Sequence, residues 1–245
     1  MPSSVFEFAL SKSSLRVFLR FQLGNLKRLI TRGKFQESIN PAAAVTIFAQ
    51  AFDSNHFIVK FLKEYDENPD LDILSSSLGL FHRGFCPTST EHALNLPESS
   101  CHRVFTYPWG VFGNENKLST KGCLNSRFCG PSTNDFIISE GLSIIKLYGD
   151  LKLSGYKPMR FPNSFIQGVW MVRKGGDRKF IVLQGNHRLA ILSHLGLMRV
   201  DVRCDQFVTR YVKEASASNW PEVISGNVSL SDASSIFNVY FKSKV

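Results

Sequence analysis

The chain has 245 residues and a mass of 27.6 kDa, a length that fits one large domain or two small ones. Its 43% hydrophobic and 20% charged residues can form a hydrophobic core, which excludes a mainly disordered chain. No stretch approaches the roughly 20 uninterrupted apolar residues of a membrane-spanning helix. Lys12, Arg16 and Arg20 also interrupt the first apolar run, where a signal peptide would have its apolar core. We therefore expect a soluble, cytoplasmic protein.

The net charge of +9 is unevenly distributed along the chain. Residues 1–35 contain seven Lys or Arg and one acidic residue, Glu7, so the excess charge belongs mainly to a basic N-terminal arm. The five cysteines are odd in number and include no C-x-x-C pair. Without an export signal, this pattern favours reduced thiols over a disulfide framework.

The first half of the chain contains two apolar segments and one long irregular segment. Residues 13–36 predict an amphipathic helix, because apolar residues recur at three- and four-residue spacing between basic ones. Such a helix packs on the protein surface or lies on an anionic membrane. Residues 42–52 have a helical composition, whereas 55–62 fit a strand as well as a helix. Residues 64–131 are rich in Pro, Gly, Ser and Asn, and their aromatic residues indicate ordered loops.

The clearest pattern lies in residues 131–204 and predicts the order helix, strand, strand, strand, helix, strand. The first helix follows the capping sequence Ser132-Thr133-Asn134-Asp135 and ends near Gly155. The expected strands are 159–161, 165–173, 179–183 and 199–203, and the second helix is 186–195. Residues 174–177, Lys-Gly-Gly-Asp, have the composition of a hairpin turn.

A last helix is expected over residues 231–241, in a C-terminal packing extension. The chain as a whole predicts an α+β protein. Its parts are a helical and loop-rich N-terminal extension (1–130), a core (131–205) and the C-terminal extension (206–245).

The sequence Gly185-Asn186-His187-Arg188 predicts a phosphate site. A strand leads to the glycine and a helix follows at once, so the N–H groups of the first helical turn and the helix dipole attract an anion. Asn186 is a favourable N-cap residue. Arg188 can bind two phosphate oxygens, and His187 can donate a hydrogen bond or transfer a proton. The same residues also fit a structural role, in which Asn186 caps the helix and Arg188 pairs with a nearby acid.

The stretch from Leu147 to Val202 resembles the ParB/sulfiredoxin superfamily. A helix leads to Gly155-Tyr156-Lys157-Pro158, and strands, a G-x-x-R element at a strand-to-helix turn, a Leu-Gly helix end and a final strand follow. Members of the superfamily bind nucleotides with their phosphates at this turn. They include CTP-binding partition proteins, the ATP-dependent reductase sulfiredoxin and a kinase of free serine. The resemblance implies a mixed-sheet nucleotide-binding core in which Gly185, His187 and Arg188 are phosphate ligands.

Two departures narrow the activity that this resemblance implies. Sulfiredoxin-like proteins have a catalytic cysteine between the glycine and the histidine, where this chain has Asn186, so sulfinic acid reduction is not expected. Partition proteins have a DNA-reading helix-turn-helix bundle after the nucleotide-binding fold. Residues 206–245 show no such pattern, so nucleic acid is a conceivable partner and not the favoured one.

What remains is phosphoryl transfer from ATP or another nucleoside phosphate, with Mg²⁺, to a small hydroxyl-bearing acceptor. This chemistry needs an acid or base near the acceptor. The serine-kinase resemblance implies a carboxylate near the start of the helix that precedes Gly155, where Asp135 and Glu140 lie. Asp135 also suits a helix cap, and Glu140 also suits a solvated helix position.

The expected catalytic residues are therefore Asp135, Glu140 and His187. The expected nucleotide-binding residues are Gly185, Asn186, His187, Arg188, Lys157 and Arg160. We predict no metal-ligand set, because the spacing of the cysteines and histidines matches no zinc finger or ribbon.

Two alternatives to the enzyme stay open. One is a non-catalytic nucleotide-sensing or DNA-associated ParB-like module. The other is a protein that contacts the membrane surface through residues 13–36.

Overall fold

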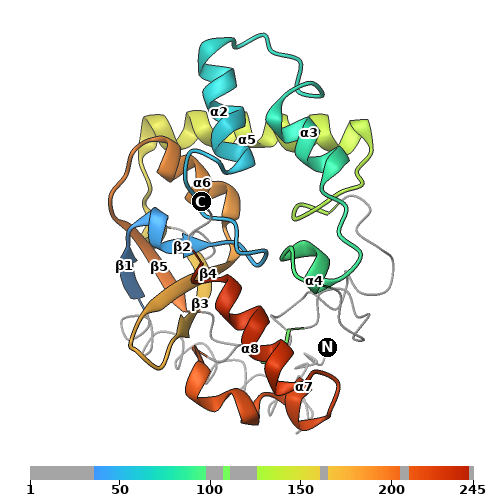
Figure 1. Ribbon diagram of the computed structural model, residues 1–245. Helices are drawn as coiled ribbons and strands as arrows, with labels where there is room; N and C mark the ends of the chain where they lie inside the picture. Colours follow the sequence, from blue (N-terminus) through green and yellow to red (C-terminus); the bar gives the residue numbers. More distant parts are fainter. Residues whose placement is uncertain (1–35, 98–106, 111–125, 161–164, 205–209, 243–245) are drawn as a thin grey trace, which may run out of the picture. The chain divides into compact units, whose positions relative to one another are not determined.

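The computed structural model describes residues 36–97, 107–110, 126–160, 165–204 and 210–242 (Figure 1). The chain separates into two units, Met1–Gln36 and Glu37–Val245, and every described residue except Gln36 belongs to the second unit. The helix expected over residues 13–36 lies outside the described residues, except for Gln36, which begins a strand. In the described residues no helix is long and apolar enough to cross a membrane.

Within the described residues, six strands form one mixed sheet at the centre of the fold. The strands are β1 (Gln36–Ile39), β2 (Ala44–Val45), β3 (Ile166–Val172), β4 (Arg178–Gln184), β5 (Val200–Cys204) and β6 (Tyr211–Lys213). Their order is β1-β5-β3-β4-β2, with β6 also paired to β3. The hairpin partners β3 and β4 are antiparallel, whereas β5 and β6 run parallel to β3, and β2 runs parallel to β4.

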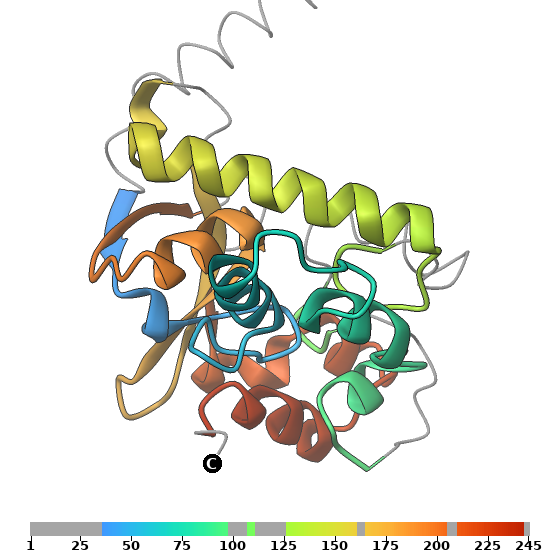
Figure 2. The same cartoon turned by 90° about the horizontal axis from the view of Figure 1, so that it is seen from above.

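Helices cover the sheet from both sides, which explains why the central residues of β3 and β4 are buried and mostly apolar. The helices are α2 (Phe57–Glu67), α3 (Ser77–Gly84), α4 (Thr90–Ala93), α5 (Asn134–Ser154), α6 (Asn186–His194), α7 (Pro221–Ile224) and α8 (Leu230–Val239). Short 3-10 helices are η1 (Pro41–Ala43), η3 (Pro158–Arg160) and η4 (Glu214–Asn219). Phe237 of α8 belongs to the same core as Met171 of β3. On the other side, α5 runs alongside α2 and α6 (Figure 2).

Both ends of α5 are capped as its sequence predicts. The Thr133 hydroxyl accepts a hydrogen bond from the Phe136 N–H at 3.3 Å, and Gly155 ends the helix with a φ of 67°. Because Ile137, Gly141 and Ile144 are buried, this side of the helix faces the core.

A hydrogen-bonded cluster fixes α5 against α2 and α6. Asp66 of α2 lies 2.7 Å from Nε2 of His194 in α6 and accepts a hydrogen bond from the Tyr148 hydroxyl of α5 at 2.9 Å. Burial by itself would raise the pKa of Asp66, but the hydrogen bonds from His194 and Tyr148 outweigh it and lower the pKa. The cluster therefore fixes the C-terminal end of α6, at His194, against α2 and α5.

The α+β class and most elements of residues 131–204 are confirmed. The hairpin, both helices and the last strand occur where the sequence predicts them, but 159–161 is wrong as a strand, since residues 158–160 form η3. Pro158, the first residue of η3, has no N–H to donate to a neighbouring strand. The strands β1, β2 and β6 were not predicted.

The helix expected over residues 42–52 is also wrong. This segment forms η1, the strand β2 and a turn, because Ala44 and Val45 pair with Phe180 and Ile181 of β4. The ambiguous residues 55–62 belong mainly to the helix α2, and the loop-rich residues contain α3 and α4. The expected division of the chain at residues 130 and 205 stays a prediction about which parts fold alone.

Candidate functional site

The turn between β4 and α6 has a backbone that glycine allows. Gly185 is the N-cap residue of α6 and has φ 90° and ψ 24°, in the left-handed region. A Cβ at this position would also lie 3.0 Å from Cγ1 of Ile166 on the neighbouring strand. The N-cap role expected for Asn186 is therefore wrong, since Asn186 is the first residue inside the helix.

The first N–H to enter the helical pattern of α6 is that of Leu189, which bonds to the Gly185 carbonyl at 2.9 Å. The N–H groups of Asn186, His187 and Arg188 precede it, at the positive end of the helix dipole. The geometry thus has the features of a helix N-terminal anion site.

Glu140 of α5 and His187 of α6 meet beside this turn. Oε1 of Glu140 lies 2.9 Å from Nε2 of His187, and both side chains are largely buried. Nε of Arg127, an exposed residue in the loop before α5, lies 3.3 Å from the same oxygen. Burial alone would raise the pKa of Glu140, but its close contacts with His187 and Arg127 outweigh burial and lower the pKa. Glu140 is therefore ionised at neutral pH, and its carboxylate orients the imidazole of His187.

Two further histidines lie near His187. His82 of α3 is buried, and its Nδ1 is 3.4 Å from the Ser132 hydroxyl. His56 is the N-cap residue of α2, and its Nδ1 accepts a hydrogen bond from the Ile58 N–H at 3.3 Å. Burial lowers the pKa of both rings, to about 3 for His56, and at His82 it outweighs the carboxylate of Glu140, which by itself would raise the pKa. At neutral pH both are uncharged.

Three buried polar atoms in this region lack a hydrogen-bond partner among the described residues. They are Nε2 of His56, Oδ1 of Asn186 and Oε1 of Glu140, whose contacts with His187 and Arg127 have ion-pair distances without hydrogen-bond geometry. Because Nδ1 of His56 accepts a hydrogen bond, the neutral ring has its proton on Nε2 and offers a donor. Buried polar atoms of this kind are normally satisfied by protein, by ordered water or by a ligand.

Arg188 extends from the same turn toward the start of β3. Nη1 of Arg188 donates to the Phe165 carbonyl at 3.3 Å. The Tyr156 hydroxyl accepts from the Ile166 N–H, and burial raises the pKa of Tyr156 to about 12. Arg203 lies over the Phe165 ring at 4.6 Å. Arg188 is therefore held beside the start of β3, where Arg203 also contacts Phe165.

The other expected site residues are not brought to the Glu140–His187 pair. Lys157 is exposed beyond the end of α5, and the side chain of Arg160 lies outside the described part of the structure. Asp135 is exposed on the outer face of α5. It is five residues before Glu140, which in a helix separates the two directions by about 140°.

His56, His82 and Arg127 were not predicted as site residues. They come from two helices and a loop far apart in the sequence, and no spacing links them to residue 187. Only one local signal in the sequence marks His56, and it indicates a helix N-cap position. His56 follows the turn residues Asp53, Ser54 and Asn55 immediately before an apolar helix.

The described residues contain no group of three or more His, Cys, Asp or Glu side chains that could hold a metal ion. Comparisons with protein-family models, with curated proteins and with solved structures found no match.

Proposed function

We propose that this protein binds a nucleotide through the Gly185–Arg188 turn and transfers a phosphoryl group from ATP to a small hydroxyl-bearing acceptor. The observation that carries the proposal is the 2.9 Å contact between Glu140 and His187 beside the N-terminus of α6. This contact places a carboxylate–imidazole pair, which can transfer a proton, beside a helix N-terminus that can bind phosphate.

The arrangement of the elements supports a ParB/sulfiredoxin-like core. The chain order α5, β3, β4, α6, β5 has the helix, hairpin, helix and final strand of that pattern, with Gly185 at the strand-to-helix turn. The parallel pairing of β3 with β5 makes the sheet mixed, as the proposed fold requires.

In the proposed reaction, backbone N–H groups at the start of α6 and the Arg188 guanidinium bind phosphate oxygens. The carboxylate of Glu140, 2.9 Å from Nε2 of His187, favours the neutral tautomer with its proton on Nε2, which leaves Nδ1 available as a base. Nδ1 takes the proton of the acceptor hydroxyl as the acceptor oxygen bonds to the γ-phosphorus and the bond to the leaving ADP oxygen breaks. Glu140 stabilises the imidazolium that results.

Mg²⁺ is expected to accompany ATP, where it neutralises charge on the phosphates. Because the described residues offer no set of three ligands, the ion would be held chiefly by phosphate oxygens and water. Magnesium commonly keeps several waters and takes only one or two protein carboxylates.

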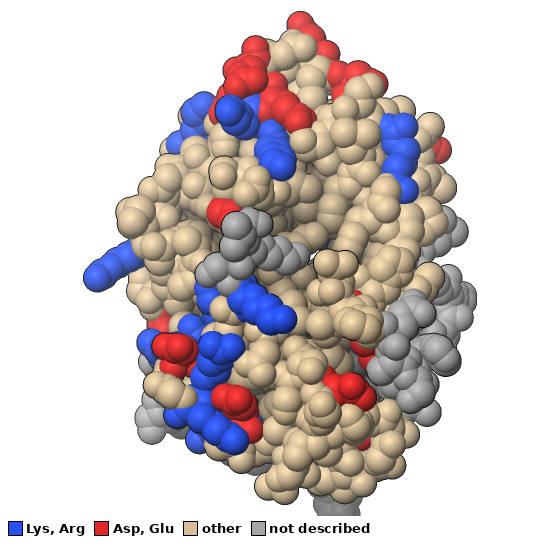
Figure 3. Space-filling view, viewed as in Figure 1, with Lys and Arg blue, Asp and Glu red and all other residues tan. Residues whose placement is uncertain are grey.

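A non-catalytic nucleotide-binding module is the second candidate, favoured by the ion pair from Arg127 to Glu140. With contacts to both Arg127 and His187, Glu140 also fits a structural role that fixes the turn. A DNA-associated form of this candidate is less favoured. On the face seen in Figure 3, basic side chains lie beside acidic ones, and Glu37 pairs with both Arg178 and Arg210.

The test is transfer of labelled γ-phosphate from Mg·ATP to a panel of hydroxyl amino acids, sugars and polyols. We expect transfer by wild type and a loss of at least 100-fold in Glu140→Gln and in His187→Gln. Asp150→Asn is the matched control, an exposed carboxylate on the same helix. Nucleotide binding without transfer to any acceptor would favour the second candidate, and no nucleotide binding would contradict both.

A further inference from the structure

The imidazole at the N-cap of α2 has a fixed orientation and one unused hydrogen-bond donor. His56 is 3% exposed, and the rings of Phe52 and Phe57 stack on it with centroids 4.7 and 4.8 Å away. Its Nδ1 accepts from the Ile58 N–H at 3.3 Å, so the proton of the neutral ring is on Nε2. Because Nδ1 faces the first turn of α2, Nε2 points away from that turn, and it has no hydrogen-bond partner among the described residues.

Packing contacts bring the first turns of α2, α5 and α6 to the same end of this group of helices. The Phe57 ring lies 6.0 Å from the ring of His82, which in turn lies 5.7 Å from the ring of Phe136 in the first turn of α5. The helix α6 packs on α2, and its first turn meets α5 through His187. Burial, and after it the electrostatic interaction with His187, lower the pKa of His56 to about 3, so the two imidazoles lie within range of each other. The unused donor of His56 is therefore near the N-terminus of α6.

A buried donor in this position needs an acceptor. An unsatisfied buried N–H costs free energy, and protein, ordered water or a ligand normally supplies its partner. The backbone groups at the start of α6 are donors as well, because the N–H groups of Asn186, His187 and Arg188 precede the first helical hydrogen bond. Several donors at one helix end match an anion with several oxygens, such as a phosphate group.

We propose that His56 is a phosphate-binding residue, whose Nε2–H donates a hydrogen bond to a phosphate oxygen of a nucleotide bound at the N-terminus of α6. This role of His56 rests on the proposed function, which places the phosphates at that turn. It adds a ligand contact from α2, outside the expected core of residues 131–205, and so makes the N-terminal extension part of the nucleotide site. The neutral ring contributes a directed hydrogen bond, whereas Arg188 contributes charge.

Two substitutions separate the donor of His56 from its capping role. An asparagine amide lies near the position of Nδ1 in histidine, so His56→Asn keeps an acceptor for the Ile58 N–H and removes the donor at Nε2. A glutamine amide reaches the position of Nε2, so His56→Gln keeps a distal donor and loses the cap. If His56 only caps α2, His56→Gln is the more damaging change, whereas phosphate binding makes His56→Asn the more damaging one for nucleotide affinity.

Calorimetric titration of Mg·ATP into the full-length chain measures this difference. We expect an affinity about tenfold weaker in His56→Asn than in wild type. His56→Gln should bind nearly as well as wild type, although loss of the cap should lower its Tm by about 2–4 °C. Ser229→Ala removes the N-cap of α8 and controls for a loss of stability alone, so its affinity should equal that of wild type. Circular dichroism establishes that each variant is folded.

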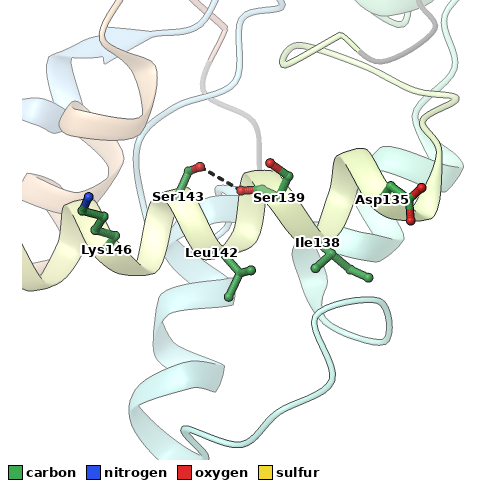
Figure 4. A pocket seen from close by; sticks show the side chains of 6 residues that line it. All are labelled: Asp135, Ile138, Ser139, Leu142, Ser143 and Lys146. Atoms are coloured by element: carbon green, nitrogen blue, oxygen red, sulfur yellow. Dashed lines mark hydrogen bonds between the residues drawn. The ribbon is translucent and has the colours of Figure 1, made fainter.

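The open hollow on the exposed side of α5 is the competing place for a nucleotide. Its volume is about 440 Å³, and Lys146 on its wall supplies a cation (Figure 4). The affinity of Lys146→Ala for Mg·ATP should equal that of wild type. A weaker affinity in Lys146→Ala with none of the loss in His56→Asn would place the nucleotide in this hollow and overturn the proposal.

The ring proton of His56 gives a readout in the unsubstituted protein. In NMR spectra of protein with isotope-labelled histidine, the Nε2–H signal that is missing from His56→Asn should shift when Mg·ATP is added. A signal that does not move would overturn the proposal and leave the donor to an internal water. Binding that is lost in Arg188→Ala but unchanged in His56→Asn would contradict this role of His56 alone, whereas absence of binding to wild type would contradict the proposed function and this role with it.

Discussion

The Glu140–His187 pair predicts a measurable coupling in the free energy of unfolding. Glu140→Gln keeps the shape of the side chain and removes its charge, so a largely buried His187 loses a charged partner at 2.9 Å. Leaving a buried polar group without its charged partner costs about 1–3 kcal/mol. For a chain of this size, that corresponds to a decrease in Tm of about 2–12 °C. Asp150→Asn, on the exposed side of α5, should change the stability by no more than about 0.5 kcal/mol.

The assay is a double-mutant cycle of Glu140→Gln, His187→Gln and the double variant, measured by urea unfolding. We expect the double variant to lose at least about 1 kcal/mol less than the sum of the single losses, because either substitution already removes the carboxylate–imidazole interaction. Additivity within about 0.5 kcal/mol would refute the reasoning.

The pH dependence supplies a second readout of the same pair. Because folding lowers the pKa of Glu140, its carboxylate stabilises the folded state above the unfolded pKa of about 4.3, and this contribution is lost as the pH falls through the folded pKa. The stability difference between wild type and Glu140→Gln should therefore be largest near neutral pH and shrink below about pH 4. A difference that stays constant down to pH 3, well below that unfolded pKa, would show that the carboxylate charge has no role.

Two further substitutions test the backbone and the buried histidine. Gly185→Ala should lower the free energy of unfolding by about 1–2 kcal/mol, because Gly185 has a φ of 90° and a Cβ there would contact Ile166. Gly149→Ala lies in a helix with open space around it and should raise the free energy of unfolding by about 0.5–1 kcal/mol, as measured by urea unfolding. Equal effects at the two glycines would contradict this account. The pKa of His56 is about 3 in the folded protein and 6.5 in the unfolded chain, so between pH 7 and pH 5 only the unfolded chain binds the proton. The free energy of unfolding of wild type should therefore fall by about 2 kcal/mol over this range. His56→Asn keeps a capping acceptor for Ile58 and should lose less over this range; parallel curves for the two proteins would count against the argument.

Local sequence signals predicted the elements whose ends are chemically marked. Thr133 and Gly155 cap the two ends of α5, and a glycine-rich turn joins the two strands of the hairpin. Each of these signals is directly next to the element whose end it determines. The short strands β2 and β6 have no such signal. Each is three residues or fewer and exists because an existing strand, β4 or β3, offers it a backbone partner.

The candidate site was predictable only in part, for the same reason. Gly185 and the helix start at residue 186 are local features, and Glu140 could be named because it shares a helix with Asp135. Which of these two acids meets His187 depends on the rotation of α5, and burial of Ile137, Gly141 and Ile144 decides it. His82 and His56 join the site through the packing of α2 and α3, which no spacing in the sequence encodes.

The central claim is that the Gly185–Arg188 turn binds phosphate groups, and calorimetric titration of Mg·ATP into the full-length protein tests it most directly. The account predicts binding by wild type and by Arg199→Ala, an exposed arginine beyond the end of α6. It also predicts at least a tenfold weaker affinity in a folded Arg188→Ala variant. Absence of binding of ATP, ADP and CTP to folded wild type, or equal affinity in Arg188→Ala, would contradict it.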